Sequence, residues 1–388
     1  MKPLNNTTHP LESLLQQHCP NGVEFKELGE LCEINGGKLN ANKAQSKGLY
    51  EFFTYDYNNP KFVDNYAWDT EALIICKKDN GENPCRYFNG KFNAFQWMRI
   101  LHSFKNEANI HYIKYYFNAI FMQFLQTNSI NISLPYIAIE TIKKFPIPLP
   151  PLEIQQKIVE ILDAFTELEA ELEAELEARL KQYHYYRNKL LSHDELENRT
   201  AKSRNDSDPT LVPLVTLGEV CEVKRGVRVT KKDLTENEKY PVFQNSLTPM
   251  GYYNQSNVNA NTPFIIVGGS AGEIGWSSSS YWAADDCIYF ICEKSLMNRF
   301  LYHALCNQQH YFLSQVRKAS IPRLSQDCIK KLKIPLPPLE VQNDIVELLD
   351  KFDTLANDLT SGIPAEIEAR KKQYEYYRER LLSFIAKD

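Results

Sequence analysis

The chain has 388 residues, of which 43% are hydrophobic and 12% aromatic, and a formal net charge of −5. This length allows two or three domains with substantial cores, and the composition excludes a disordered chain. Because the sequence has no apolar run long enough to span a membrane, no apolar signal core at its start and no Cys-x-x-Cys pair among its nine cysteines, we expect a cytoplasmic protein without membrane contact.

The first part of the chain predicts a short helix followed by a globular unit. The apolar spacing near the start predicts an N-terminal helical segment over residues 1–20. In residues 21–147, strand patterns at 72–76 and 92–101 precede an aromatic-rich helical pattern at 110–125. Strands followed by a helix predict an α+β unit.

The next stretch, residues 148–192, predicts one long helix. It begins Pro-Leu-Pro-Pro-Leu-Glu, which places Pro151 at the first helical position and Glu153 in the first turn, where the helix dipole favours negative charge. Apolar residues then recur with the 4-3-4-3-4 spacing of a heptad seam. A helix from Glu153 to Leu191 spans about 58 Å at roughly 1.5 Å per residue. It cannot bury its seam alone, so it needs a partner helix.

The same order of elements then occurs a second time. Residues 193–212 are polar and predict a flexible linker, and residues 213–334 open like the first unit at an offset of 189 residues. Residues 335–388 repeat the Pro-Leu-Pro-Pro-Leu-Glu motif at an offset of 187 and the Gln-Tyr-x-Tyr-Tyr-Arg motif at an offset of 191. Gly362 and Pro364 lie near the four extra residues and predict a kink or break. The repeat predicts two-fold pseudo-symmetry, with two globular units joined by two long helices packed as an antiparallel coiled coil.

Basic charge is concentrated in the globular units. Residues 148–212 hold 8 Lys and Arg against 14 Asp and Glu, and residues 335–388 hold 7 against 11. Residues 21–147 hold 14 against 13, and residues 213–334 hold 14 against 10. This difference is expected if the globular units meet phosphates and the helices do not, although ordinary surface variation accounts for it equally well.

Basic loops in the two units are the candidate DNA contacts, because Arg and Lys mixed with hydroxyl side chains hold phosphates and contact base edges. A solvated surface loop would also be charged. The residues that we expect to face a duplex are Lys38, Lys43, Lys77, Lys78, Arg86 and Arg99 in the first unit, and Arg225, Arg228, Lys231, Lys232, Arg317, Lys318 and Arg323 in the second. The glycine cluster at residues 268–275 lacks the ending of a P-loop, which leaves a tight ligand-approach loop and a plain turn as alternatives.

The sequence contains no catalytic constellation. The Asn/Asp-Pro-Pro-aromatic tetrapeptide of an adenine methyltransferase is missing, and so is a Walker motif. Glu24-Phe-Lys26 is an isolated pair without the second acid that a nuclease site requires, and the eight histidines follow no nucleophile or metal pattern. We therefore expect a non-catalytic chain that holds no cofactor and no metal of its own.

Two divergent units alternating with two nearly identical helices resemble the specificity subunit of a type I restriction-modification system. The likeness rests on the two repeated helix motifs and on the opening Cys19-Pro-Asn-Gly-Val-Glu-Phe-Lys-Glu-Leu-Gly29, and it covers essentially the whole chain. It implies that residues 21–147 and 213–334 are target recognition domains, each reading one half of a bipartite DNA site. It also implies that residues 148–192 and 335–388 are conserved spacer helices.

The resemblance further implies partner subunits. Two modification subunits, which bind S-adenosylmethionine and methylate adenine, would dock on the spacer helices, and restriction subunits that use ATP and Mg would join them to cleave unmethylated DNA. The candidate docking residues are Tyr183, Tyr185, Tyr186, Arg187, Tyr374, Tyr376, Tyr377 and Arg378. The alternative for these tyrosines is packing between the two helices. The rival functions are a coiled-coil scaffold with two protein-binding heads and an autonomous methyltransferase, which the missing tetrapeptide disfavours.

Overall fold

The structure is a computed structural model that describes residues 19–20, 22–56, 59–75, 85–128, 137–204, 211–235, 238–318, 320–357 and 362–383. Most of the expected N-terminal helical segment therefore lies outside the described residues. Contacts within the chain divide it into two compact units. Unit 1 combines Met1–Glu171 with Ile367–Asp388, and unit 2 is Leu172–Glu366.

Unit 1 is built on a six-stranded sheet with the strand order β2-β7-β5-β6-β3-β4. Neighbouring strands are antiparallel except for β3 and β6, which are parallel. The strands are β2 (Glu33–Gly36), β3 (Tyr50–Phe53), β4 (Lys61–Val63), β5 (Trp68–Ile75), β6 (Cys85–Ala94) and β7 (Arg99–His102). Because side chains alternate along a strand, β5 places Leu73 and Ile75 in one core and Ala72 and Ile74 in a second core on the opposite face.

Helix α3 (Ile110–Thr127) connects this sheet to the long helix of the unit. Its aromatic side chains share one core with Leu73 and Ile75 of the sheet and with Ile158 and Leu162 of α5. The remaining elements of unit 1 are β1 (Phe25–Glu27), α2 (Leu28–Leu31), η1 (Ala41–Lys43), α4 (Ile139–Lys143) and β8 (Pro146–Pro148). The antiparallel pair β1–β8 fastens the start of the globular unit to the residues that lead into α5.

The globular part of unit 2 has a similar order of elements, with one more strand and one more helix among the described residues, and a different sheet arrangement. A four-stranded sheet has the order β10-β16-β13-β14, a three-stranded sheet has the order β12-β11-β15, and β9 pairs with β17. The strands are β9 (Leu214–Thr216), β10 (Cys221–Arg225), β11 (Tyr240–Phe243), β12 (Gly251–Tyr253), β13 (Thr262–Ile266), β14 (Ile274–Ser277), β15 (Trp282–Ala283), β16 (Cys287–Cys292) and β17 (Lys333–Pro335). The helices are α7 (Leu217–Val220), η2 (Lys231–Asp233), α8 (Asn298–Asn307), α9 (Gln309–Gln315) and α10 (Gln326–Lys331). The predicted α+β class is confirmed.

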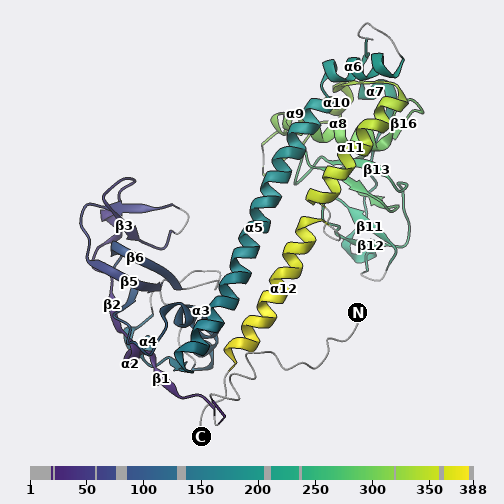
Figure 1. Cartoon of the computed structure of the whole chain (residues 1–388). Coiled ribbons are helices and arrows are strands. Elements are labelled where there is room, and N and C mark those ends of the chain that lie inside the picture. The colour runs from purple at the N-terminus through teal and green to yellow at the C-terminus, as the bar shows by residue number, and fades with distance from the viewer. Residues whose placement is uncertain are drawn as a thin grey trace. The chain divides into compact units, whose positions relative to one another are not determined.

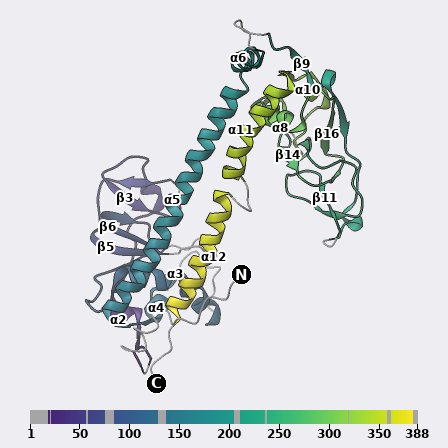
Figure 2. The same cartoon turned by 45° about the vertical axis from the view of Figure 1, so that its right-hand side comes forward.

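The long helices match the repeat, with one interruption (Figure 1 and Figure 2). Helix α5 runs without a break over Leu152–Leu190, 39 residues that contain neither Gly nor Pro. The second copy is divided into α11 (Leu339–Asn357) and α12 (Ile363–Leu382), which confirms the expected break. Pro364 is the second residue of α12, where a helix needs no backbone N–H donor, so it starts a new helix rather than disrupting one.

In unit 1, α5 and α12 pack against each other in opposite directions. The ring of Phe165 stacks on Tyr377 with centroids 5.4 Å apart and contacts Tyr374 at 6.2 Å. Glu169, one turn after Phe165 on α5, pairs with Lys371 at 3.1 Å. Lys371 lies one turn before Tyr374 on α12, so the two helices run in opposite directions. The predicted antiparallel packing is therefore present at these contacts. The continuous heptad seam of a coiled coil stays a prediction.

The flexible linker predicted after α5 is wrong for most of its length. Residues His193–Ser203 form α6, whose N-cap Ser192 accepts a hydrogen bond from the backbone N–H of Glu195. Arg199 pairs with Glu195 one turn earlier, at 2.8 Å. Leu196 is fully buried in the core of unit 2. A capped, ion-paired helix with one buried apolar contact is ordered even though its composition is polar.

One buried glutamine in each copy attaches the globular unit to its long helix. In unit 1 the side-chain amide of Gln155 donates to the carbonyls of Glu107 and Pro150, and its oxygen accepts from the N–H of Asn109. In unit 2 the amide of Gln342 makes the same three hydrogen bonds, with two donated and one accepted, all between 2.8 and 2.9 Å. The repeated Pro-Leu-Pro-Pro-Leu-Glu motif therefore introduces the same attachment twice.

Candidate nucleic-acid and partner interfaces

Two exposed arginines of unit 2 are held by one shared carboxylate. Asp286, whose side chain is 15% exposed, forms ion pairs with Arg323 and with Arg225, the latter at 3.6 Å. The Nε of Arg225 also donates to the carbonyl of Asp285 at 2.6 Å. The side chains of Arg323 and Arg225 stay 47% and 54% exposed. Such a cluster offers oriented donors and a net positive charge, which suits phosphates and base edges.

The glycine cluster next to this pair serves the packing of the chain itself. A Cβ on Gly268 would lie 2.6 Å from the Asp286 carboxyl carbon, and a Cβ on Gly275 would lie 2.2 Å from the ring of Phe264. Gly268 also forms a β-bridge with Arg323, and Gly269 has a positive φ of 85°. These glycines are therefore explained by close approach of the chain to itself, which favours the structural alternative over a ligand loop.

The other basic candidates of unit 2 are exposed. Lys231 and Lys232 lie in η2, whose first turn is fixed by reciprocal hydrogen bonds between Thr230 and Asp233. Those hydrogen bonds lower the pKa of Asp233. Exposed side chains are also found at Arg228, Arg317 and Lys318. Their DNA contacts remain a prediction.

The six candidate DNA contacts of unit 1 comprise three exposed residues, two residues outside the described part of the chain, and the buried Arg99. Lys38, Lys43 and Arg86 are exposed, and Lys38 lies over the ring of Trp68 at 4.9 Å. Lys77 and Lys78 lie outside the described residues.

The prediction for Arg99 is wrong. This side chain is only 8% exposed, and its guanidinium donates to the carbonyls of Gln96, Met98 and Ile137. It therefore fastens β7 to the chain before α4 instead of facing a duplex. The sequence pattern of a basic residue in a strand could not reveal these backbone partners.

The tyrosines of the two Gln-Tyr-x-Tyr-Tyr-Arg motifs divide in the same way in both copies. Tyr185 and Tyr376 are 60% and 55% exposed. Each contacts the next tyrosine edge-on with the same geometry, 5.4 Å between centroids and 74° between planes. Tyr186 stacks on Phe352 at 5.1 Å, as Tyr377 does on Phe165. Tyr186 and Tyr377 therefore pack between helices, which was the alternative to partner docking. Tyr185 and Tyr376, the middle tyrosines of the two motifs, are exposed, and their docking to a partner stays a prediction.

The arginines of these motifs also match. Arg187 lies 5.1 Å from the ring centroid of Tyr183, and Arg378 lies 5.6 Å from that of Tyr374. In both arginines the Nε is buried and has no hydrogen-bond partner among the described residues. A buried N–H without an acceptor is costly, and in both copies this cost falls on the same position of the motif.

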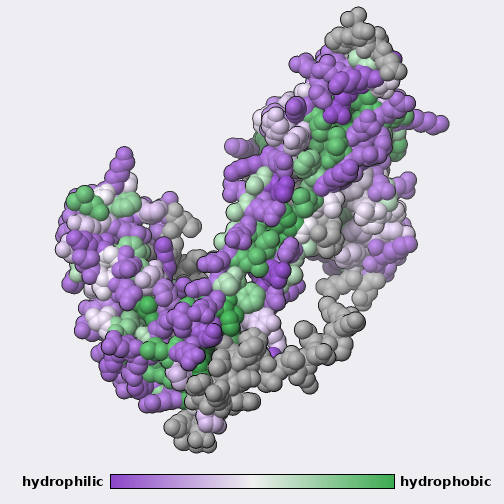
Figure 3. All heavy atoms as spheres, viewed as in Figure 1, coloured by the Kyte–Doolittle hydropathy of each residue, from purple (hydrophilic) through white to green (hydrophobic). Residues whose placement is uncertain are grey.

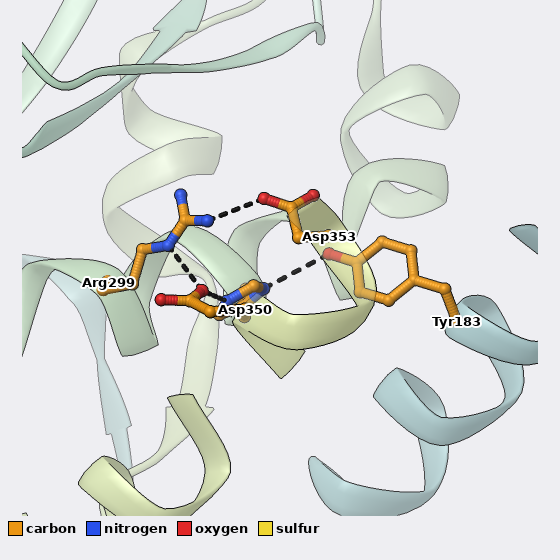
Figure 4. A network of polar contacts seen from close by, with 5 residues as sticks. Tyr183, Arg299, Asp350 and Asp353 are labelled. Atoms are coloured by element: carbon orange, nitrogen blue, oxygen red, sulfur yellow. Dashed lines mark hydrogen bonds and ion pairs between the residues drawn. The ribbon is translucent and has the colours of Figure 1, made fainter. Parts of the chain in front are cut away.

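A polar network in unit 2, shown in Figure 4, was not anticipated from the sequence. Arg299 of α8 donates to Asp350 at 2.7 Å and to Asp353 at 2.6 Å, both on α11. His303 contacts Asp350 through Nε2 at 2.7 Å, and Tyr183 through Nδ1 at 3.3 Å. The network ties α8 to both α11 and α5. At the corresponding place in unit 1, the Tyr115 hydroxyl donates to Asp163 at 2.5 Å.

One cluster of possible metal ligands occurs among the described residues. His193, Asp194 and Glu197 bring ligand atoms within 4.8 Å of one another at the start of α6. His193 is already engaged, with Nε2 2.9 Å from the Val212 carbonyl and Nδ1 3.4 Å from Glu197. The cluster is accounted for by the attachment of α6 to the following chain.

These features define a duplicated frame, in which two different α+β units are attached to long helices by the same hydrogen bonds. Residues 20–182 and 211–369 both match the family described as Type I restriction modification DNA specificity domain. The chain therefore belongs to the family of type I restriction-modification specificity subunits, as the sequence motifs predicted.

Individual relatives agree with this assignment. A putative type I restriction enzyme specificity subunit of Haemophilus influenzae is 31% identical over 98% of this chain and 99% of its own length. An Escherichia coli type I restriction enzyme specificity subunit is 32% identical over 72% of each chain. The crystal structure of a type I S subunit from M. genitalium has the same fold, with a TM-score of 0.62, 20% identity, and coverage of 93% of this chain and 96% of that one. These relatives are named as specificity subunits, the non-catalytic class that the sequence predicted. Among the described residues, no helix combines the length and the apolar character needed to cross a membrane.

Proposed function

We propose that this chain reads a bipartite, asymmetric target in double-stranded DNA, one half with residues 21–147 and the other with residues 213–334. The observation that carries the proposal is that two globular units with different sheets are attached to their long helices by the same hydrogen bonds. Gln155 and Gln342 make the same hydrogen bonds to their units, whereas the sheets differ in strand number and order. One shared frame with two different surfaces suits two different half-sites separated by an unread gap.

In the second unit, Arg225 and Arg323 are the best-positioned DNA contacts. Their guanidinium groups are exposed and oriented by Asp286, so little side-chain entropy is lost on binding. Arginine paired with guanine, or with a phosphate, is the commonest contact of this type. The basic residues of the first unit, Lys38, Lys43 and Arg86, contribute in the same way.

The long helices carry the partner surfaces. Apolar side chains are visible along these helices in Figure 3, and in α11 the exposed ones include Leu348 at 36% and Leu355 at 40%. Tyr185 and Tyr376 add two equivalent exposed rings. Two equivalent surfaces suit two modification subunits, which supply S-adenosylmethionine and the methyl transfer. Restriction subunits, with ATP and Mg, join through them.

The test is adenine methylation profiling in cells with and without this chain, in the presence of its modification subunit. We expect a bipartite motif that disappears when the chain is deleted. Replacing residues 213–334 with the second unit of another family member should change one half-site only. Unchanged methylation on deletion, or both half-sites changing together, would refute the proposal and favour a protein-binding scaffold.

A matched pair of variants tests the arginine assignment. Arg323→Ala should weaken duplex binding and relax the preference at one base pair, at a cost of about 1–3 kcal/mol if it contacts a base. Lys372→Ala, which removes an exposed lysine paired within α12 to Glu368, should leave both properties unchanged.

A further inference from the structure

Two cysteines of unit 2 lie opposite each other on neighbouring strands. Cys221 is the first residue of β10 and Cys292 is the last residue of β16, and the antiparallel register pairs them directly. The thiol of Cys221 donates to the sulfur of Cys292, with 3.3 Å between the two Sγ atoms. Both side chains therefore lie on the same face of the sheet, which is expected for directly opposite residues.

The backbone at this pair has the geometry that a disulfide requires. The N–H of Glu293 donates to the carbonyl of Val220, one position beyond the cysteines, so Val220 and Glu293 are a hydrogen-bonded pair. Because hydrogen-bonded and non-hydrogen-bonded pairs alternate along an antiparallel ladder, Cys221 and Cys292 are a non-hydrogen-bonded pair. The Cα atoms of such a pair are about 4.5 Å apart, and disulfides span Cα separations of roughly 4.4 to 6.8 Å. The two sulfurs can therefore be joined without displacing the strands.

The two thiols differ in their exposure to solvent. Cys221 is only 6% exposed and belongs to the core of unit 2. Cys292 is half-buried and packs against that core. The hydrogen bond to Cys292, together with burial, raises the pKa of the Cys221 thiol, which therefore stays protonated. A reagent from solution thus reaches Cys292 first, and Cys221 stands behind it as the second thiol.

Unit 1 provides an internal comparison, because a serine stands where unit 2 has its second cysteine. Cys32 follows Leu-Gly-Glu-Leu as Cys221 follows Leu-Gly-Glu-Val. The register of β2 with β7 pairs the residue after Cys32 with His102, and the next residue of that strand's chain is Ser103. The thiol of Cys32 donates to the carbonyl of Leu28 at 3.5 Å. The facing thiols are therefore a feature of unit 2 and not of the repeated frame.

We propose that Cys221 and Cys292 form a reversible disulfide when the chain meets hydrogen peroxide. The Cys292 sulfur attacks one peroxide oxygen, the O–O bond breaks, and the released hydroxide leaves with the thiol proton as water. The Cys221 sulfur then attacks the sulfenic acid on Cys292, so the S–S bond forms, the S–O bond breaks and a second water leaves. Overall, the two thiols lose two electrons to one peroxide molecule, which becomes two waters. A dithiol reductant reverses the reaction.

The disulfide fastens the two strands that carry the arginine cluster. Arg225 is the last residue of β10, and its partner Asp286 immediately precedes β16. The bridge also closes the chain between residues 221 and 292, which limits the conformations of the unfolded state and so stabilises unit 2. The melting temperature of unit 2 should therefore rise by about 5 °C or more on oxidation.

The test exposes the folded, fully reduced chain to hydrogen peroxide and then blocks the remaining thiols. Peptide mass spectrometry of the digested wild type should find Cys221 cross-linked to Cys292, with a mass lower by two hydrogens than the two free peptides together. A dithiol should restore both thiols. Cys328→Ser, which removes another half-buried thiol, is the matched control and should give the same cross-link.

Two single variants test the order of the steps. In Cys221→Ser the sulfenic acid of Cys292 should persist and be trapped by dimedone, a reagent for sulfenic acids. In Cys292→Ser the buried Cys221 should give little dimedone adduct. Neither variant should show the rise in melting temperature that oxidation produces in the wild type and in Cys328→Ser.

The wild-type measurement decides the inference even if a variant folds poorly. Absence of the cross-linked peptide from the wild type, or an equal yield of disulfides that involve other cysteines such as Cys32, would overturn it. Complete cross-linking with an unchanged melting temperature would overturn the stabilising role of the bridge. None of these measurements uses DNA, so their outcome is independent of the proposed function.

Discussion

His303 lies 2.7 Å from the carboxylate of Asp350, inside the network that ties α8 to the long helices of unit 2. Burial lowers the pKa of His303 below 6.5, against the opposing effect of its hydrogen bond to Asp350. Burial alone would raise the pKa of Asp350, but the hydrogen bonds from His303 and Arg299 bring it below 3.8. Both groups therefore bind protons less readily in the folded chain than in the unfolded chain.

The first prediction is a loss of stability in mild acid. Because the unfolded state takes up protons first, protonation of His303 favours unfolding as the pH falls below 6.5, and protonation of Asp350 adds to this below pH 3.8. The melting temperature of the wild type should therefore decrease as the pH falls below about 6.5. In the His303→Gln variant, the slope of melting temperature against pH should be smaller in this range, whatever the absolute stability of the variant. His310→Gln, at an exposed position of α9, is the control and should keep the wild-type slope. Equal slopes in all three proteins would contradict the prediction.

The second prediction concerns the glutamine attachment. Gln342→Leu keeps the volume of the side chain but leaves the carbonyls of Ser295 and Pro337 and the N–H of Met297 without their partner. Each unsatisfied buried group costs roughly 1–3 kcal/mol, so unit 2 should lose about 3 kcal/mol or more of unfolding free energy. Denaturant unfolding measures this loss. The neighbouring Asn343→Leu, at an exposed position, should change stability by less than about 0.5 kcal/mol. Similar losses in the two variants would refute the special role of Gln342.

The sequence predicted those parts of the fold that depend on local pattern. The uninterrupted Leu152–Leu190 helix follows from its heptad spacing and its lack of Gly and Pro, and the break before Ile363 follows from Gly362 and Pro364. The repeat of whole elements, with its nearly identical motifs, was sufficient to predict the α+β frame and the family.

Features that depend on distant contacts could not be predicted in this way. Helix α6 looked like a linker because its only strong apolar anchor, Leu196, is buried by residues from elsewhere in unit 2. Arg99 looked like a surface cation because one of its acceptors, the Ile137 carbonyl, lies 38 residues away. The Arg299 and His303 network was missed for the same reason, since Asp350 is 51 and 47 residues distant. A pairwise comparison of the two repeats would have singled out Asp163 and Asp350 as equivalent positions.

The third prediction separates partner docking from helix packing. Tyr185→Ala and Tyr376→Ala remove exposed rings, so they should weaken binding of the modification subunit with little change in the melting temperature of this chain. Tyr183→Ala is the contrasting variant, because Tyr183 is 3% exposed and its hydroxyl contacts His303. It should lower the melting temperature, since removal of a buried aromatic ring costs about 3–5 kcal/mol. Unimpaired partner binding in the Tyr185→Ala Tyr376→Ala double variant would exclude this surface from the docking site.

The fourth prediction is that catalysis needs the partner subunits. The purified chain should transfer no methyl group from S-adenosylmethionine, hydrolyse no ATP and cleave no DNA, because its sequence has none of the motifs for these reactions. Adding the modification subunit should produce sequence-directed adenine methylation. Radiolabelled methyl transfer to a duplex that contains the target measures this gain, and turnover by the chain alone would contradict the prediction.

The last prediction concerns the three Glu-Leu-Glu-Ala units at residues 167–178, which lie wholly inside α5. Their leucines could simply extend the apolar seam of a solvated acidic helix. Deleting one unit, Glu171 to Ala174, keeps the helix continuous but removes about 6 Å of rise and roughly 40° of rotation beyond a full turn. Base pairs are stacked about 3.4 Å apart, so the gap between the two half-sites should shorten by one or two base pairs. Mapping methylated adenines for the deletion variant tests this. Substitution of Glu171, Leu172 and Glu173 by alanine, which preserves the helix length, is the matched control and should leave the gap unchanged. The same half-sites at a shorter spacing would show that the length of α5 sets the gap between them. Altered half-site bases, or an unchanged gap, would contradict the prediction.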